Sequence, residues 1–150
     1  MKILIASDHA GFNYKTILLQ DIIEAGYDVT DLGTYNQIAT DYPDHAAQVA
    51  RKILAGEAHR AIIICGSGIG VSVAANKFKG IRAGVCHDNY SAHQCVEHDD
   101  VNVLCLGERV IGIEPAREIV FSFLHARFSH EERHQRRLDK INTLEDLNMK

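Results

Sequence analysis

Short apolar runs alternate along the chain with longer stretches of helical spacing, and this alternation limits the possible folds more than any other feature. The apolar runs, which we predict to be strands, are residues 2–6, 27–32, 61–65, 81–86 and 101–106. The helical stretches are residues 12–25, 44–54, 71–78, 89–97 and 114–127. The run at 61–65 shows no alternation, which is typical of a central parallel strand covered on both faces. We therefore predict an α/β fold with a five-stranded parallel sheet and helices on both faces.

The length and the net charge of the chain limit how many domains it can form and which partners it can bind. With 150 residues, 46% of them apolar, the chain can bury a core and is too short for two ordinary domains, so we expect a single domain over 1–150. Its longest apolar run is too short and too polar to span a bilayer. The net charge of −4 argues against nucleic acid as a partner. The N-terminal apolar stretch is too short for a secretory segment, so we expect a cytoplasmic protein with reduced thiols.

The tail is predicted to form one further helix over 129–147. Ser129 followed by Glu132 is a capping-box signal for its start. Apolar residues then recur on one face, and this stripe has to cover apolar surface. Each strand connection already has a helix, so we expect the stripe to pack on a partner subunit, with docking on its own domain as the alternative. The stripe consists of Leu138, Ile141, Leu144 and Leu147.

A glycine-rich turn follows the central strand, directly before a predicted helix. Several backbone N–H groups of such a turn can point at one spot and hold an anion, such as a phosphate, a carboxylate or an enolate oxygen. The turn matches neither GxGxxG nor the P-loop. The alternative is a tight strand-to-helix connection that only needs small residues. The turn consists of Gly66, Ser67, Gly68, Ile69 and Gly70.

Cys65 ends the central strand beside this turn. The positive end of the following helix favours a thiolate there, and a thiolate can act as a nucleophile or a general base. The alternative is a buried cysteine that only packs in the core. For Cys86, Cys95 and Cys105 we expect core packing alone.

Three side chains near the ends of predicted elements are candidates for proton transfer. Asp8 and His9 follow the first strand, where they can bind hydroxyls or an anion and relay protons. The alternative for Asp8 is a helix N-cap. His98 lies at a helix end, and Asp99 and Asp100 favour its charged form, so it can serve as an acid or a base. The alternative for His98 is a solvated helix end.

Arginines provide a possible anion clamp. Arg133 and Arg137 are four residues apart and share one helical face. Together with Arg109 they can hold a phosphate. The alternative is a solvated basic patch, or ion pairs with Glu131 and Glu132.

A metal site is not expected. His130 and His134 have the i, i+4 spacing that zinc sites use, but no carboxylate or cysteine completes a ligand set.

Five segments in order resemble the ribose-5-phosphate isomerase B family, which also includes the galactose-6-phosphate isomerase subunits. The resemblance runs from Met1 to about Leu144. Each segment alone is a modest signal, but five at consistent spacing are specific. The segments are residues 7–11, 40–43, 65–70, 74–77 and 133–137.

The resemblance implies a Rossmann-like three-layer α/β/α sandwich. It implies an aldose–ketose isomerase that acts on a phosphorylated sugar without a metal or an organic cofactor. It also implies a homodimer or homotetramer whose active sites are shared between subunits.

The resemblance further implies a role for each matching residue. Cys65 corresponds to the base that moves a proton between C1 and C2 of the sugar. His98 corresponds to the acid that helps to open the furanose ring, with Asp8 alongside. Ser67 and the amides of 66–70 correspond to the cradle of the enediolate. The phosphate ligands of the family correspond to His9, Arg109, Arg133 and Arg137. Tyr42 corresponds to a residue that lies near the sugar.

Departures from the family pattern bear on the substrate. Asp99 stands where many members have Asn, and a carboxylate can only accept hydrogen bonds. One branch uses a Glu as base, but Ala74 and Ala75 occupy that region here, so the assignment of Cys65 stands. We expect ribose 5-phosphate as substrate. The alternatives are a tetrose phosphate, allose 6-phosphate, a non-catalytic subunit, or a nucleotide- or flavin-binding module.

Overall fold

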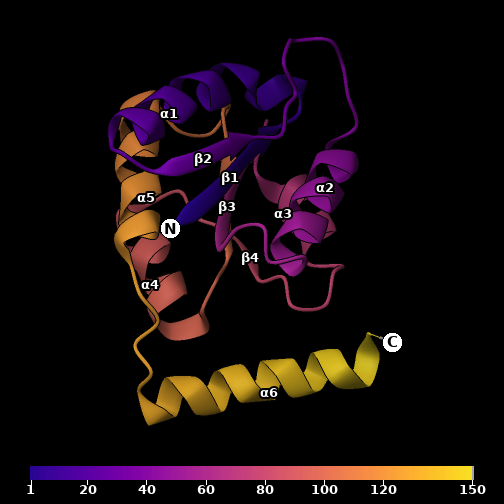
Figure 1. Cartoon of the computed structure of the whole chain (residues 1–150), viewed down its shortest axis with the longest axis vertical. Helices are drawn as coiled ribbons and strands as arrows, with labels where there is room; N and C mark the ends of the chain where they lie inside the picture. The colour runs from indigo at the N-terminus through magenta and orange to yellow at the C-terminus, as the bar shows by residue number, and fades with distance from the viewer. Residues whose placement is uncertain (150) are drawn as a thin grey trace.

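The computed structural model describes residues 1–149, which form one parallel sheet with helices on both faces (Figure 1). The strands are β1 (Lys2–Ser7), β2 (Asp28–Asp31), β3 (Arg60–Cys65), β4 (Ala83–Val85) and β5 (Val103–Gly107). The helices are η1 (His9–Gly11), α1 (Phe12–Glu24), α2 (Tyr42–Leu54), α3 (Ile69–Ala75), α4 (Asn89–Asp99), α5 (Ile113–His125) and α6 (Glu132–Asn148). The strand order is β2-β1-β3-β5-β4, with every pair parallel. The predicted fold class is confirmed.

Two apolar layers cover the sheet. On one face α1, α4 and α5 contribute Leu18, Val96 and Phe123 to a core under β1, β3 and β5. On the other face α2 and α3 contribute Val49 and Val71. Figure 1 shows α1, α5 and α4 on one side of the strands and α2 and α3 on the other. This is a three-layer sandwich, and it explains why β3 has apolar side chains on both faces.

The strand order reverses beside β1. The chain passes from β1 to β2 on one side, and β3 then pairs with the other side of β1. Ser7 of β1 lies in register with Ile64 of β3, so the residues that follow these two strands are neighbours. Open parallel sheets bind ligands at the carboxyl ends of the strands where the order reverses. The topology therefore places Asp8 beside Cys65.

Several element boundaries differ from those expected. The helix expected from residue 44 begins at Tyr42, because Pro43 fits the first helical turn, where no N–H is needed. The helix expected over 71–78 is Ile69–Ala75. The strand expected over 81–86 is only Ala83–Val85. The 3₁₀ helix η1 was not expected.

The C-terminal helix begins three residues later than predicted. Ser129 is not its N-cap: Glu131 occupies that position, and no side chain caps the first turn. The predicted capping box is therefore wrong. The Ser129 Oγ lies instead 2.6 Å from Nδ1 of His134.

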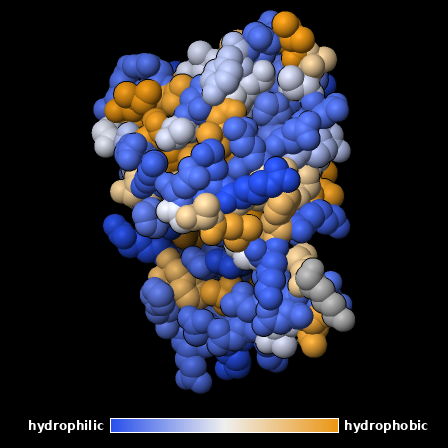
Figure 2. Space-filling model, turned by 45° about the vertical axis from the view of Figure 1, so that its right-hand side comes forward, coloured by the Kyte–Doolittle hydropathy of each residue, from blue (hydrophilic) through white to orange (hydrophobic). Residues whose placement is uncertain are grey.

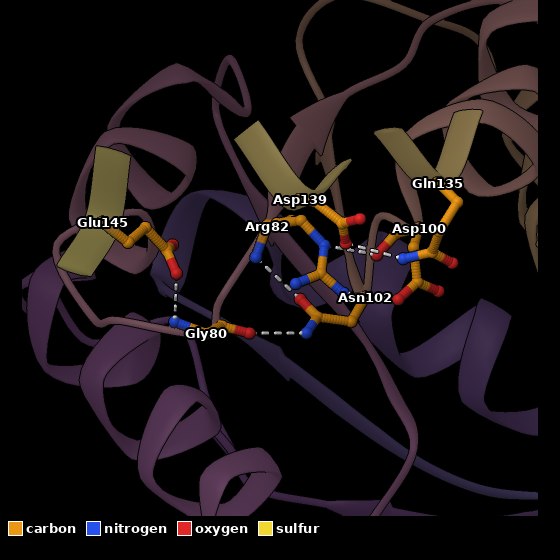
Figure 3. A network of polar contacts seen from close by, with 7 residues as sticks. All are labelled: Gly80, Arg82, Asp100, Asn102, Gln135, Asp139 and Glu145. Carbon is orange, nitrogen blue, oxygen red and sulfur yellow. Dashed lines mark hydrogen bonds and ion pairs between the residues drawn. The ribbon is translucent and has the colours of Figure 1, made fainter. Parts of the chain in front are cut away.

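Helix α6 runs across one end of the layered body, below the other elements in Figure 1. Glu145 accepts a hydrogen bond from the backbone N–H of Gly80 at 3.1 Å, and Figure 3 shows this contact beside the Arg82–Asp100 pair. The predicted stripe is largely open, because Leu138 is buried but Leu144 is 61% exposed. Figure 2 shows hydrophobic surface on both sides of the waist between α6 and the body. Residues 1–149 therefore cover the apolar stripe of α6 only in part.

A buried ion pair joins α1 to the end of β2. The ammonium of Lys15, whose side chain is 2% exposed, lies 2.6 and 2.7 Å from the two carboxylate oxygens of Asp31. We expect Lys15→Met to lower the free energy of unfolding by about 3 kcal/mol, because Asp31 loses its cation in a mostly buried position. Urea denaturation measures this change. The matched control is Lys52→Met, which breaks an exposed pair with Glu57 and should cost less than about 1 kcal/mol.

Candidate active site

An open cavity lies at the carboxyl ends of β1 and β3. Its volume is about 400 Å³. Its lining combines the strand ends, the glycine-rich turn, the start of α2 and the segment after β5. The lining residues are Asp8, His9, Ala10, Tyr42, Cys65, Gly66, Ser67, Gly70, Arg109 and Val110. The structure thus brings together most of the residues that the sequence singled out.

The glycine-rich turn holds the sulfur of Cys65. The N–H of Gly68 points at Sγ at a distance of 3.1 Å. Gly68 has φ +79°, a left-handed conformation that disfavours a side chain. The turn also packs tightly on the end of β5, because a Cβ on Gly107 would lie 2.6 Å from the carbonyl carbon of Ser67. Backbone geometry therefore fixes the position of the thiol.

Cys65 differs from the other cysteines in its surroundings. It is 5% exposed and lines the cavity. Cys86 and Cys105 are buried among apolar residues, as predicted, and burial raises the pKa of Cys105. Cys95 is only partly buried; its hydrogen bond to Cys86 raises its pKa. Among residues 1–149, Cys65 is the one cysteine that borders this cavity.

Asp8 serves as a cap and also lines the cavity. Its Oδ1 accepts hydrogen bonds from the N–H groups of Ala10 at 2.9 Å and Gly11 at 3.2 Å. The capping role left open from the sequence is therefore present. Gly11 packs against β3, where a Cβ would lie 2.4 Å from the carbonyl oxygen of Ile64. This close approach keeps Asp8 at the edge of the cavity.

His9 is oriented by a distant loop. Its Nδ1 accepts a hydrogen bond from the N–H of Thr40 at 3.2 Å. With Nδ1 as acceptor, the ring hydrogen is on Nε2, which remains free to donate. The hydroxyl of Thr40 also bonds to His45 at 3.0 Å, and burial lowers the pKa of His45. Sequence reasoning did not identify His45, because its contact with Thr40 depends on how the chain turns into α2.

Arg109 lies over the glycine-rich turn. Its backbone N–H donates to the carbonyl of Gly66 at 3.0 Å. A Cβ on Gly66 would lie 3.3 Å from Nη1 of Arg109. The guanidinium therefore contributes positive charge at the same edge of the sheet as Cys65.

Four predicted site residues lie elsewhere: His98 and Asp99 on α4, and Arg133 and Arg137 on α6. None of them lines this cavity within residues 1–149. His98 stacks on His134 instead, with ring centroids 4.0 Å apart. Arg133 pairs with Glu131 at 2.8 Å, which is the alternative that the sequence left open.

The direction of the helices explains the separation. Helix α4 starts after the carboxyl end of β4 and runs back to the amino end of β5. His98 lies near the amino ends of the strands. This follows from the segment after it, where the carbonyl of Asn102 accepts a hydrogen bond from the N–H of Ala61 at the start of β3. Eleven helical residues span roughly 16 Å. His98 and Cys65 therefore sit at opposite edges of one sheet.

Neither a metal cluster nor a membrane span emerges from residues 1–149. No group of three or more His, Cys, Asp or Glu side chains in this part of the chain is arranged to hold a metal ion. None of its helices has the length and apolar character needed to cross a membrane.

The chain is similar to known proteins along nearly its whole length. The Ribose/Galactose Isomerase family model matches residues 3–141. The chain belongs to this family. The relationship that the motifs indicated is thereby confirmed, and with it the assignment of the chain as an isomerase.

Individual family members match at similar levels of identity. Ribose-5-phosphate isomerase B of Escherichia coli is 45% identical, over 96% of each chain. The D-erythrulose-4-phosphate isomerase 2 of Mycolicibacterium smegmatis is 47% identical, over 85% of this chain and 86% of that protein. The solved structure of Clostridium thermocellum ribose-5-phosphate isomerase B is 46% identical and has a TM-score of 0.95, covering 98% of this chain and 99% of that chain.

The geometry of the turn gives a direct prediction for this isomerase. Gly68→Ala should lower kcat about tenfold, because a Cβ would lie 3.0 Å from the backbone of Leu106 and displace the N–H that faces Cys65. It should also lower the free energy of unfolding by about 1–2 kcal/mol through the left-handed φ. Steady-state kinetics and urea denaturation measure the two effects. Gly56→Ala is the matched control: its φ is +74° with open space around it, so stability should fall while kcat is unchanged.

Proposed function

We propose that the chain interconverts ribose 5-phosphate and ribulose 5-phosphate, with Cys65 as the base. The observation that carries this proposal is the sulfur of Cys65, which borders the cavity and faces the N–H of Gly68 at 3.1 Å. An aldose–ketose isomerisation moves one proton between C1 and C2 through an enediolate. It needs a base near an acidic carbon and hydrogen-bond donors at the oxygen that becomes negative.

The cavity offers groups suited to each step. The thiolate of Cys65 takes the proton from C2 of the open sugar and returns it to C1. The Ser67 hydroxyl and amides of the glycine-rich turn donate to the enediolate oxygens, except the amides of Gly68 and Ile69, which face Cys65 Sγ and Ser67 Oγ. One well-placed donor can contribute about 3 kcal/mol. Asp8 and Tyr42 contact the sugar. His9 and Arg109 bind the phosphate at the opposite end of the substrate.

We further propose that a homodimer completes the site, with an assembly of two such dimers as a further possibility. His98 and Asp99, together with Arg133 and Arg137, would enter the cavity of the partner subunit. The position of His98 at the opposite edge of the sheet from Cys65 supports this arrangement. The open stripe of α6 does so as well, since Ile141 and Leu144 are 37% and 61% exposed. His98 then protonates the ring oxygen as the furanose opens.

The proposed location is the cytoplasm, where reducing conditions keep Cys65 a free thiol.

A tetrose 4-phosphate is the second candidate substrate. The support is the 47% identity to a D-erythrulose-4-phosphate isomerase, together with Asp99 where many members have Asn. A panel assay with phosphorylated tetroses, pentoses and hexoses tests the proposal. We expect the highest kcat/KM for ribose 5-phosphate. A higher value for the tetrose or for allose 6-phosphate would replace the substrate assignment, and no turnover of any sugar would support a non-catalytic subunit.

A further inference from the structure

A buried histidine that the proposed mechanism does not use lies against His98. His134, in the first turn of α6, is 2% exposed. Its ring stacks on that of His98 with centroids 4.0 Å apart and planes 25° apart. His98 belongs to α4, so this contact joins the two helices that carry the separated site residues. It leaves the ring of His98 little freedom to tilt.

Hydrogen bonds fix both rings at Nδ1. Gln94 Nε2 lies 2.8 Å from Nδ1 of His98, and because an amide nitrogen only donates, the hydrogen of the neutral His98 ring is on Nε2. Ser129 Oγ lies 2.6 Å from Nδ1 of His134 and accepts the N–H of Glu131 at 3.2 Å. Its hydroxyl hydrogen is therefore available to His134.

The linker before α6 is itself tied to α4. The N–H of Ser129 donates to the carbonyl of Glu97 at 3.0 Å, next to His98 in the chain. Ser129, His134 and His98 thus form one connected unit. The orientation of His98 depends on α6 through this unit.

The charges around His134 favour its neutral form. Burial lowers its pKa, and the charges of His98, Arg133 and Arg137 lower it further, whereas Glu131 raises it. Two stacked imidazoles repel each other when both are protonated. A neutral His134 therefore adds no like charge beside His98.

We propose that His134 is a positioning residue for His98: it fixes the ring plane of His98 and keeps Nε2–H as the group presented to the sugar. This inference rests on the proposed function, in which His98 is the acid for ring opening. His134 itself does not touch the substrate. Its loss should lower kcat, because a small misplacement of a catalytic group costs up to about 100-fold in rate.

Kinetics in two backgrounds test this role. With ribose 5-phosphate, His134→Leu should lower kcat about tenfold and change KM less than about twofold, and Ser129→Ala should lower kcat about threefold. In the His98→Gln background both changes should have no further effect, because residues that act through each other are not additive. Equal losses in both backgrounds, or full kcat in His134→Leu, would overturn the proposal.

A conservative variant separates positioning from folding. His134→Phe keeps a flat ring but loses the bond to Ser129, so its kcat should lie between those of the wild type and His134→Leu. Thermal unfolding of each variant checks that the chain folds. If His134→Leu does not fold, Ser129→Ala and His134→Phe provide the comparison. A kcat for both that equals the wild-type value would contradict the role of His134.

Histidine side-chain NMR gives a readout that needs no turnover. Long-range ¹H–¹⁵N spectra of the full-length wild type should show neutral His98 as the Nε2–H tautomer. In His134→Leu both neutral tautomers of His98 should be present. An unchanged His98 tautomer would contradict the positioning role of His134. A fully active His98→Gln variant would instead remove the assigned acid from the proposed function, and the NMR result would still decide whether His134 orients the ring.

Discussion

Replacing Cys65 by alanine is expected to lower kcat for ribose 5-phosphate by about 1000-fold while leaving sugar-phosphate affinity within a few-fold. The reason is that a positioned base contributes about 10²–10⁴ in rate, whereas the phosphate is held by other groups. The substitution removes the acceptor of the Gly68 N–H, but the backbone carbonyls of Cys65 and Gly66 keep their bonds to the segment after β5, so the turn should stay in place. Steady-state kinetics and isothermal titration calorimetry with ribose 5-phosphate measure the two quantities.

Cys95→Ala is the matched control for this experiment. Cys95 is partly buried on α4 and does not border the cavity, so its loss should change kcat less than twofold. Normal turnover by Cys65→Ala would remove the sulfur from the mechanism. A parallel loss of affinity and of thermal stability would instead make Cys65 a packing residue, the alternative that the sequence left open.

Local patterns in the sequence predict the fold, and they identify most of the residues that line the candidate cavity. Spacing of apolar residues identifies the five strands, and the rule that sites form at carboxyl ends of strands brings Asp8 next to Cys65. What the sequence misses depends on long-range contacts. Thr40 reaches His9 across 31 positions. Ser129 matches a capping-box pattern, but its hydroxyl forms a hydrogen bond with His134 instead.

The connections between strands also explain why the predicted site residues form two separate groups. A helix that leaves the carboxyl end of one parallel strand must return to the amino end of another strand. His98 lies at the end of such a helix, α4. Helix α5 runs in the same direction as α4, so α6, which follows α5, also begins near the amino ends of the strands. The motifs show that these residues occur in one chain, but they do not show which copy of the chain supplies each residue to a given site.

Hybrid dimers should recover activity that neither parent has. In the proposed homodimer, Cys65→Ala and His98→Gln should each disable both sites. In a hybrid of the two, one site holds both substitutions and the other holds neither, if Cys65 and His98 of one site come from different subunits. Hybrids isolated after co-expression with two different tags should therefore show about half of the wild-type kcat per dimer.

A second hybrid provides the control for this complementation. Cys65 and Arg109 border the same cavity of one chain, so a hybrid of Cys65→Ala with Arg109→Ala leaves both sites damaged and should stay inactive. Recovery in the first hybrid and not in the second would assign His98 to the partner of Cys65. An inactive first hybrid would mean that each chain builds its own site. His98 would then have to move a long way, because it lies at the amino ends of the strands and Cys65 lies at their carboxyl ends.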